Sequence, residues 1–150
     1  MANELLAFGV DLEDVRERLS ALKYFTTVER LQDFVLDIEE GVSGTPPLAY
    51  VSVASETAEP NKLSGGPDAW SQRVTVTVSV LFCIPASRAD EKPMDDVEDA
   101  RKAVVRMLLA WTPKGAESPF QFARFLLRDS RDGLIWSEVL MRTSYHLRRT

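Results

Sequence analysis

The sequence has very few residues of the types that build disulfides and zinc sites, with one cysteine, Cys83, and one histidine, His146, in 150 residues. A disulfide within one chain needs two cysteines, and a Cys/His metal cluster needs three or four ligands. Neither can form within a single chain, so only carboxylate-based metal sites stay open. The sequence also lacks G-x-G-x-x-G, Walker A, G-x-S-x-G, H-E-x-x-H and C-x-x-C. An enzyme is therefore not indicated.

Long apolar runs are absent too. No stretch approaches the roughly 18 apolar residues of a membrane span. The start, MANELLAFGVDLEDV, contains Glu4 and Asp11 where a signal peptide has a basic region. We therefore expect a cytoplasmic protein with no membrane segment. With 45% hydrophobic and 27% charged residues, the chain has the composition of a globular protein, and its length predicts one domain over residues 1–150.

Charge is unevenly distributed along the chain. The net charge of −5 argues against a dedicated nucleic-acid binder. Residues 1–40 are acidic, whereas residues 121–150 are basic. Both ends can simply be solvated surfaces, or an acidic surface can meet a basic surface on a neighbouring copy. The second interpretation makes these residues candidates for a subunit interface: Arg124, Arg128, Arg142, Arg148, Glu13 and Glu17.

The stretch Gln72–Cys83, QRVTVTVSVLFC, alternates apolar with mainly polar residues. A period of two is typical of a long strand with one buried face. The predicted buried face consists of Val74, Val76, Val78, Val80 and Phe82. We predict that this is the central strand of a sheet and that its valines lie in the core.

Apolar residues at helical spacing predict three amphipathic helices. The first runs from Asp11 to Leu22, with its first residue as N-cap, and the second runs from Val28 to about Glu40. The third begins near Pro93 and carries Val104 and Trp111 on its apolar stripe, so we predict both as core residues. Pro113 and Gly115 end this helix.

A strand is predicted over Leu48–Ala54, followed by a loop over Ser55–Ala69 that has Leu63 as its only large aliphatic residue. So little apolar surface cannot offset the entropy of ordering the loop. We predict that it is mobile in the isolated subunit; it is either a tolerated insertion or a segment that becomes ordered on a partner. The partner-contact candidates are Glu59, Asn61, Lys62, Gly65 and Gly66.

Two closing strands, about Pro119–Arg128 and Leu134–Leu147, read as a hairpin with a turn over Asp129–Gly133. A short strand or extended link is predicted at Tyr24–Thr27. The fold class is therefore α+β: a mainly antiparallel sheet of about four strands, with helices packed mainly on one face. The order is helix, short strand, helix, strand, strand, helix, strand, strand.

Three features carry residual chemical possibilities. Asp95 and Asp99, at the start of the third helix, could bind a cation, although acids at a helix start are usually solvated. His146 could act as a general base, but its place on a polar strand face favours a solvated or hydrogen-bonded histidine. Cys83 ends a buried-looking strand and is predicted to be a packing residue.

The order of these segments resembles the tail terminator proteins of tailed bacteriophages and prophages, also described as minor tail or tail completion proteins. The resemblance runs through FTTVERLQDF, PPLAYVSVA, a Gly/Pro/Asn loop, QRVTVTVSVLF, DDVEDARKAVVRMLLAWTP, PFQFARFLL and DGLIWSEVLMRTSYHLRR. The segment LLAWTP is similar to the Leu-Gly-Trp-x-Pro ending common in such proteins, with Ala110 in place of the glycine.

This resemblance implies an architectural role, with no catalytic residues and no cofactor. It implies a homo-oligomeric ring, a hexamer, that ends tail-tube growth and presents a surface to the head connector. Its partners would be further copies of itself, the tube protein and the connector protein, in the virion and, during assembly, in the bacterial cytoplasm. Two alternatives stay open: another neck or tail-tube component, and a small cytoplasmic enzyme that uses carboxylates.

Overall fold

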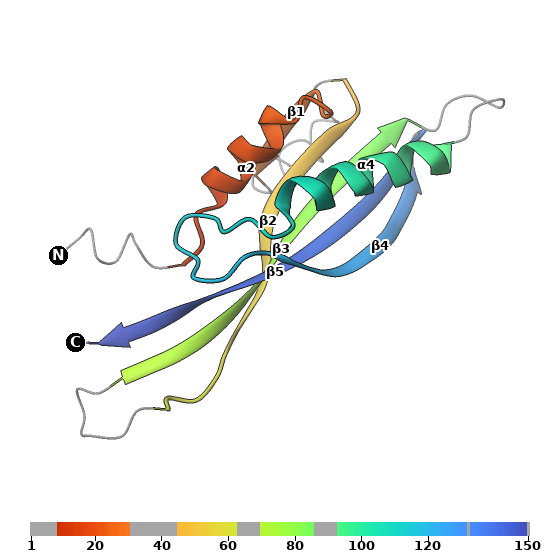
Figure 1. Ribbon diagram of the computed structural model, residues 1–150. Coiled ribbons are helices and arrows are strands. Elements are labelled where there is room, and N and C mark those ends of the chain that lie inside the picture. Colours follow the sequence, from red (N-terminus) through yellow and green to blue (C-terminus); the bar gives the residue numbers. More distant parts are fainter. Residues whose placement is uncertain (1–8, 31–44, 63–69, 86–92, 132, 150) are drawn as a thin grey trace.

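The computed structural model describes residues 9–30, 45–62, 70–85, 93–131 and 133–149. Within these residues, five strands form one sheet in the order β1-β2-β3-β5-β4, and helices α2 and α4 lie on one face of it (Figure 1). β1 is parallel to β2, and the other pairings are antiparallel. The predicted α+β class with a mainly antiparallel sheet is confirmed. The sheet differs in detail from the expected one, because it has five strands rather than about four and its β1–β2 pair is parallel.

β3 (Trp70–Pro85) is the centre of the sheet and pairs with β2 (Leu48–Ala58) on one side and β5 (Leu134–Arg149) on the other. Its predicted buried face is confirmed, because all five members are at most 4% exposed: Val74, Val76, Val78, Val80 and Phe82. These side chains form one apolar cluster with residues of both helices and of β5. The helices therefore cover the valine face, as the pattern requires.

The short edge strand lies slightly later in the chain than predicted. β1 spans Thr27–Arg30, where Val28 is buried and the four residues pair with Leu48–Val51. The predicted second helix therefore cannot begin at Val28, because the backbone there is extended. The helical spacing of this segment does not exclude a strand, since one buried valine among polar residues also fits a four-residue edge. The remainder of that prediction, residues 31–40, lies outside the described residues.

Helix α2 (Leu12–Ala21) begins where the sequence indicates. The Asp11 side chain accepts a hydrogen bond from the Glu13 amide at 3.0 Å, so the predicted N-cap is confirmed. Val15 and Leu19 are fully buried one turn apart. α2 packs on β1 and β2 and also touches α4.

Helix α4 (Pro93–Leu108) packs on β3 and β5 and ends earlier than the predicted Trp111. The end is set by Ala110, whose φ of +64° is left-handed and cannot continue a right-handed helix. The chain then reverses: the Ala110 amide donates to the Phe120 carbonyl at 2.9 Å, and the Phe120 amide donates to the Trp111 carbonyl at 2.9 Å. Trp111 is half-buried and packs against the core from this connection.

Replacing Ala110 by glycine should stabilise the protein. A non-glycine residue in the left-handed region costs about 1–2 kcal/mol, while glycine adds some backbone entropy to the unfolded chain. We expect the free energy of unfolding to rise by about 0.5–1 kcal/mol for Ala110→Gly, measured by urea denaturation. Ala103→Gly, within α4, is the control and should lose about 1 kcal/mol. A destabilised Ala110→Gly variant would contradict the left-handed geometry.

The predicted loop over Ser55–Ala69 is shorter than expected. Ser55–Ala58 belong to β2 and pair with Val74–Thr77 across a bulge. The chain stays against β3 beyond that point, because the Glu59 amide donates to the Arg73 carbonyl at 2.9 Å and Asn61 Oδ1 accepts from the Ser71 amide at 2.8 Å. Backbone and amide hydrogen bonds thus supply the order that apolar burial does not. Residues 63–69, including Gly65 and Gly66, lie outside the described residues.

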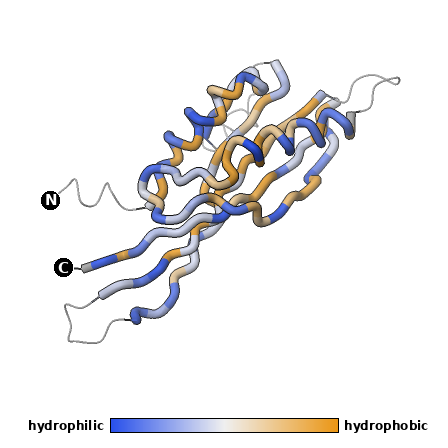
Figure 2. The backbone as a smooth tube through the Cα atoms, viewed as in Figure 1, coloured by the Kyte–Doolittle hydropathy of each residue, from blue (hydrophilic) through white to orange (hydrophobic). Residues whose placement is uncertain are grey.

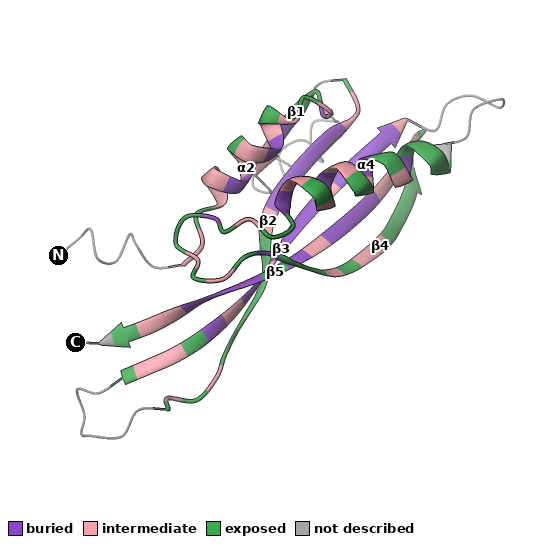
Figure 3. Ribbon diagram, viewed as in Figure 1, coloured by how far each residue is buried: buried purple, intermediate pink, exposed green. Residues whose placement is uncertain are grey.

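The ends of β2, β3 and β5 extend beyond the helices as a three-stranded arm, defined here as residues 57–62, 70–73 and 146–149 (Figure 1). Apolar residues concentrate where the helices cover the sheet, and the arm is mainly hydrophilic (Figure 2). Most of the arm is intermediate or exposed, in contrast to the buried strands under the helices (Figure 3). Backbone pairing rather than a core therefore holds the arm together.

The closing hairpin is confirmed, but its turn is tighter than the predicted Asp129–Gly133. β4 (Gln121–Arg131) continues to pair with β5 as far as the Arg131–Leu134 pair, and Gly133 has a left-handed φ of +74°. Two bulges interrupt β4, at Phe122/Arg124 and at Leu127/Asp129. They decide which β4 side chains face the helices.

Candidate interaction surfaces

An ion pair between Arg128 and Glu138 lies on the sheet face opposite the helices. The sequence did not predict this contact within the chain. Glu138 of β5 is only 9% exposed, and its carboxylate accepts from the Ser79 hydroxyl and from Arg128, whose Nε lies 2.9 Å from Oε1. Leu126 lies directly opposite Glu138 in the β4–β5 ladder, so Arg128, two residues further along β4, lies on the same face. Arg128, a predicted subunit-interface residue, is therefore already bound within its own chain. The alternation of residues in β5 predicts that Glu138 lies on the polar face. The pairing registers of β5 with β3 and β4 then bring Ser79 and Arg128 next to Glu138, and the sequence alone does not show these registers.

A second predicted interface arginine is also paired internally. Arg148 Nη1 lies 2.5 Å from Glu117 Oε1, and His146 Nδ1 contacts the other oxygen of the same carboxylate. The hydrogen bond from Arg148, followed by that from His146, holds the pKa of Glu117 below its ordinary value. This cluster ties the connection before β4 to the arm. It also gives His146 a structural hydrogen bond.

Arg124 and Arg142 differ from the first two arginines. Both are exposed, and neither forms an ion pair or hydrogen bond with another residue in the part of the chain that the structure describes. Arg124 lies opposite Leu140 in the β4–β5 ladder, and Arg142 is two residues further along β5, so both side chains are diagonal neighbours on the sheet face away from the helices. Two adjacent cations in this position suit an anionic partner.

Of the two acidic interface candidates on α2, Glu13 forms ion pairs within the chain and Glu17 does not. Glu13 bonds Arg16 at 2.5 Å and lies 3.5 Å from Arg30, and these contacts, the Arg16 hydrogen bond first, lower the pKa of Glu13. Glu17 is exposed and forms no ion pair with any other described residue. Glu17 is thus the acidic candidate that stays available for an external cation.

The remaining candidates fall into two groups. Of the partner-contact residues, Glu59 and Lys62 form an ion pair at 3.1 Å near the arm, and Asn61 binds the β3 backbone. Of the predicted core residues, four are fully buried, and Trp111 is half-buried with the Arg18 guanidinium 4.5 Å from its ring centroid. The four buried residues are Val76, Val78, Val80 and Val104.

The residues that left chemical alternatives open in the sequence are Cys83, Asp95 and Asp99. Burial raises the pKa of the Cys83 thiol to about 11, so the group stays protonated at neutral pH. Asp95 and Asp99 are exposed on α4, and the described residues contain no group of three or more His, Cys, Asp or Glu that could hold a metal ion. Neither helix in the described ranges is long and apolar enough to cross a membrane.

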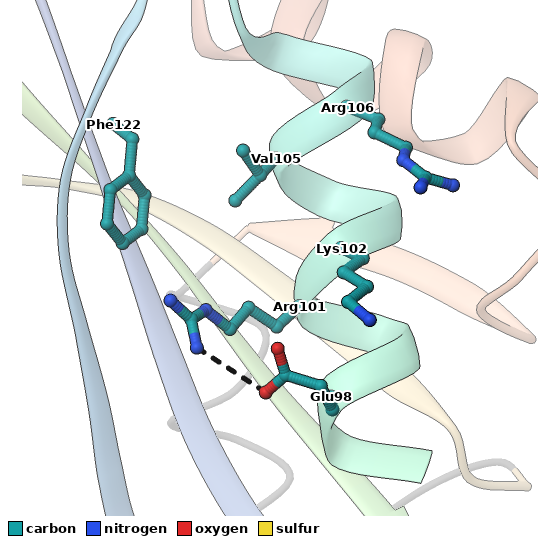
Figure 4. Close-up of a pocket in the computed structure, with 6 residues that line it drawn as sticks. All are labelled: Glu98, Arg101, Lys102, Val105, Arg106 and Phe122. Atoms are coloured by element: carbon teal, nitrogen blue, oxygen red, sulfur yellow. Dashed lines mark hydrogen bonds and ion pairs between the residues drawn. The ribbon is translucent and has the colours of Figure 1, made fainter. Parts of the chain in front are cut away.

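A groove lies between α4 and the edge strand β4. It is a hollow of about 250 Å³ lined by Glu98, Arg101, Lys102, Val105, Arg106 and Phe122. Figure 4 shows Arg101 extending from α4 toward Phe122, whereas Lys102 and Arg106 extend from the other side of the helix. Arg101 Nη1 donates a hydrogen bond to Glu98 Oε2 at 3.4 Å. The Arg101 guanidinium also lies 4.8 Å from the Phe125 ring centroid. The groove thus combines an aromatic wall with an excess of positive charge.

These surfaces define a class. Exposed unpaired cations, exposed large apolar residues and an open sheet edge are typical of proteins that act by binding other proteins. A family model described as phage tail terminator protein matches residues 1–150. The chain belongs to the phage tail terminator protein family, and is therefore a structural protein of the phage tail.

Comparison with solved structures supports the fold. A chain in a structure titled "Virion of native gene transfer agent (GTA) particle" superposes with a TM-score of 0.52 at 16% identity, over 93% of this chain and 96% of that chain. At this identity the likeness concerns the fold. A search of curated proteins found no match.

Proposed function

We propose that this protein assembles with copies of itself into a ring, a hexamer, that caps the tail tube. The ring ends tube polymerisation and provides the surface to which the head connector joins. Family membership supports this role. The virion is the site of action, after assembly in the bacterial cytoplasm.

The observation that best supports a ring is the exposed pair Arg124 and Arg142, which has no ion-pair partner among the described residues. A closed ring of identical subunits joins two different surfaces of the same chain, so each subunit needs complementary patches. The arginine pair supplies the cationic patch, and Glu17 on α2 supplies an anion that is equally free. Arg128 and Arg148 are set aside for this role because Glu138 and Glu117 already bind them.

Charge reversal tests the ring contact. Arg142→Glu should weaken self-association by about tenfold at low salt, since an attractive contact becomes repulsive, and salt should weaken the wild-type oligomer. Sedimentation velocity across a salt series measures both effects. Lys114→Glu, an exposed change of the same charge outside the patch, is the control and should assemble like wild type. An oligomer indifferent to Arg142→Glu and to salt would remove this contact from the ring.

Capping requires a separate measurement. Wild-type protein added to polymerising tube protein of the same phage should stop growth and remain at one tube end in electron micrographs. Tubes that grow unchanged in the presence of the ring would favour the alternative, another neck or tail-tube component. We also assign the end of the arm, with Glu59, Asn61 and Lys62, to contact with a tail partner, because these residues lie away from the helices (Figure 1). Gly65 and Gly66, outside the described residues, stay candidates for the same contact.

A further inference from the structure

The outer face of helix α4 carries exposed charged side chains. The helix packs on β3 and β5 through its buried residues, which are Val97, Ala100, Val104 and Leu108. Four exposed residues lie on the opposite side of the helix, within about 60° of one another around its axis. They form what we call the charged stripe: Asp95, Asp99, Lys102 and Arg106. Figure 4 shows Lys102 and Arg106 extending away from Phe122.

The four members of the charged stripe are not paired with one another. None of them forms an ion pair or a side-chain hydrogen bond with another described residue, whereas Arg101 of the same helix pairs with Glu98 at 3.4 Å. Residues three or four positions apart on a helix surface are neighbours and can pair. Asp99 and Lys102 have this spacing and do not pair in the structure. The stripe therefore presents two carboxylates and two cations to an external partner.

The spacing of the charged stripe makes it complementary to its own reversed copy. Its order along the helix is acid, acid, base, base, and the steps between neighbours are four, three and four residues. Acids first and bases last also suit the helix dipole, so the order alone indicates no partner. The symmetric spacing adds the second feature. When two copies of α4 lie antiparallel in register, Asp95 faces Arg106 of the second copy and Asp99 faces Lys102 of the second copy.

We infer that α4 of one copy pairs with α4 of a second copy, antiparallel and about a two-fold axis, through the charged stripe. Each complementary pair then occurs twice in the contact, and a parallel arrangement would place like charges opposite each other. A two-fold contact uses the same surface on both copies, whereas a ring contact joins two different surfaces. The α4 contact therefore goes beyond the proposed ring. Where that ring forms, the α4 contact joins two rings, and this consequence rests on the proposed function.

The strength of this contact depends on how many copies meet at once. Exposed ion pairs contribute little each, and association has a large entropic cost. One α4 pair therefore dissociates readily in dilute solution. Two facing rings bring several α4 pairs together, and linked contacts reinforce one another without any new interaction. We thus expect paired rings at protein concentrations at which single subunits would not pair.

Sedimentation velocity at low salt over a concentration series tests the pairing. Wild-type protein should form a particle of twice the mass of the ring, and added salt should separate it into single rings. Lys102→Glu reverses two pairs in every two-fold contact, so it should raise the dissociation constant for pairing by at least about tenfold and leave single rings. Lys114→Glu, an exposed change of the same charge outside the stripe, is the control and should pair like wild type.

A charge-swapped stripe tests the antiparallel register. The fourfold variant Asp95→Lys, Asp99→Lys, Lys102→Glu and Arg106→Glu should pair with itself but not with wild-type protein, because mixed antiparallel contacts place like charges together. The swap opposes the helix dipole, so urea denaturation checks that the variant is folded. If the fourfold variant is unstable, the double variant Asp99→Lys/Lys102→Glu changes fewer charges and should also recover the self-pairing that Lys102→Glu alone loses.

Three results would overturn the inference: no particle larger than the ring at low salt, a larger particle that Lys102→Glu leaves intact, or mixed particles of wild-type and charge-swapped protein. Failure of the ring proposal gives a different pattern. Chains that pair without forming a ring would sediment as a dimer, which Lys102→Glu converts to a monomer and Arg142→Glu leaves unchanged. Rings that form without pairing would have the same mass in wild type and in Lys102→Glu.

Discussion

Val78→Asp is expected to lower the free energy of unfolding by at least about 4 kcal/mol and to leave much of the protein unfolded at 25 °C. Val78 is 0% exposed at the middle of β3, between β2 and β5 and beneath the helices. An aspartate there either keeps an unpaired charge in an apolar core or takes up a proton at a cost, and it also loses the packing of two methyl groups. Urea denaturation followed by circular dichroism measures the change.

Val53→Asp is the matched control. Val53 lies directly opposite Val78 in the β2–β3 ladder, yet it is 39% exposed, so its carboxylate can reach water. We expect it to cost only about 1 kcal/mol. If Val78→Asp does not fold, Val78→Thr keeps the shape and should still cost about 1–3 kcal/mol for burying a hydroxyl. Equal losses for Val78→Asp and Val53→Asp would mean that β3 is not the centre of the core.

The contrast between these two valines shows what the sequence pattern can and cannot supply. Alternation over Gln72–Cys83 predicts the buried face of β3 because a fully buried strand between two neighbours leaves a regular pattern. The same alternation in Leu48–Ala54 predicts a strand but not that Val53 is partly exposed, because exposure depends on where the helix layer ends. The continuation of β2 to Ala58 depends on pairing with β3. Backbone pairing leaves no trace in hydropathy.

The interaction surfaces were less predictable than the fold, because strand register and bulges decide which charged side chains pair within the chain. Opposite charge at the two ends of the chain pointed to four arginines, but their availability is decided by register and by bulges. The β4–β5 register brings Arg128 to Glu138, and the connection before β4 brings Glu117 to Arg148. The bulge at Phe122/Arg124 puts Phe122 and Phe125 on the same face, beside α4. A pattern of period two cannot show where an extra residue interrupts it.

The connection between α4 and β4 also contacts the start of α2, far away in the sequence. The Asp11 amide donates to the Lys114 carbonyl at 2.9 Å, and the Lys114 amide donates to Asp14 Oδ2 at 2.8 Å. Gly115 follows with a left-handed φ of +84° and lies against the backbone of Gly9. These contacts join the first helix to the segment that carries Trp111 and Glu117, and thus to both the core and the arm.

Gly115→Ala should therefore destabilise the protein by about 2–5 kcal/mol. The left-handed backbone costs an alanine about 1–2 kcal/mol. In addition, the new methyl group would overlap the Gly9 carbonyl oxygen and lie 3.1 Å from its carbon, and displacing packed backbone costs about 1–3 kcal/mol more.

Gly133→Ala is the control, because Gly133 has a similar φ of +74° with no atom near its added carbon, so it should cost about 1–2 kcal/mol. Thermal denaturation compares the two variants, with a further loss of about 2–4 °C for each extra kcal/mol. Hydrogen exchange at Asp11 and Lys114 should accelerate in Gly115→Ala alone, and equal melting temperatures with unchanged exchange would show that this clamp does not hold the two segments together.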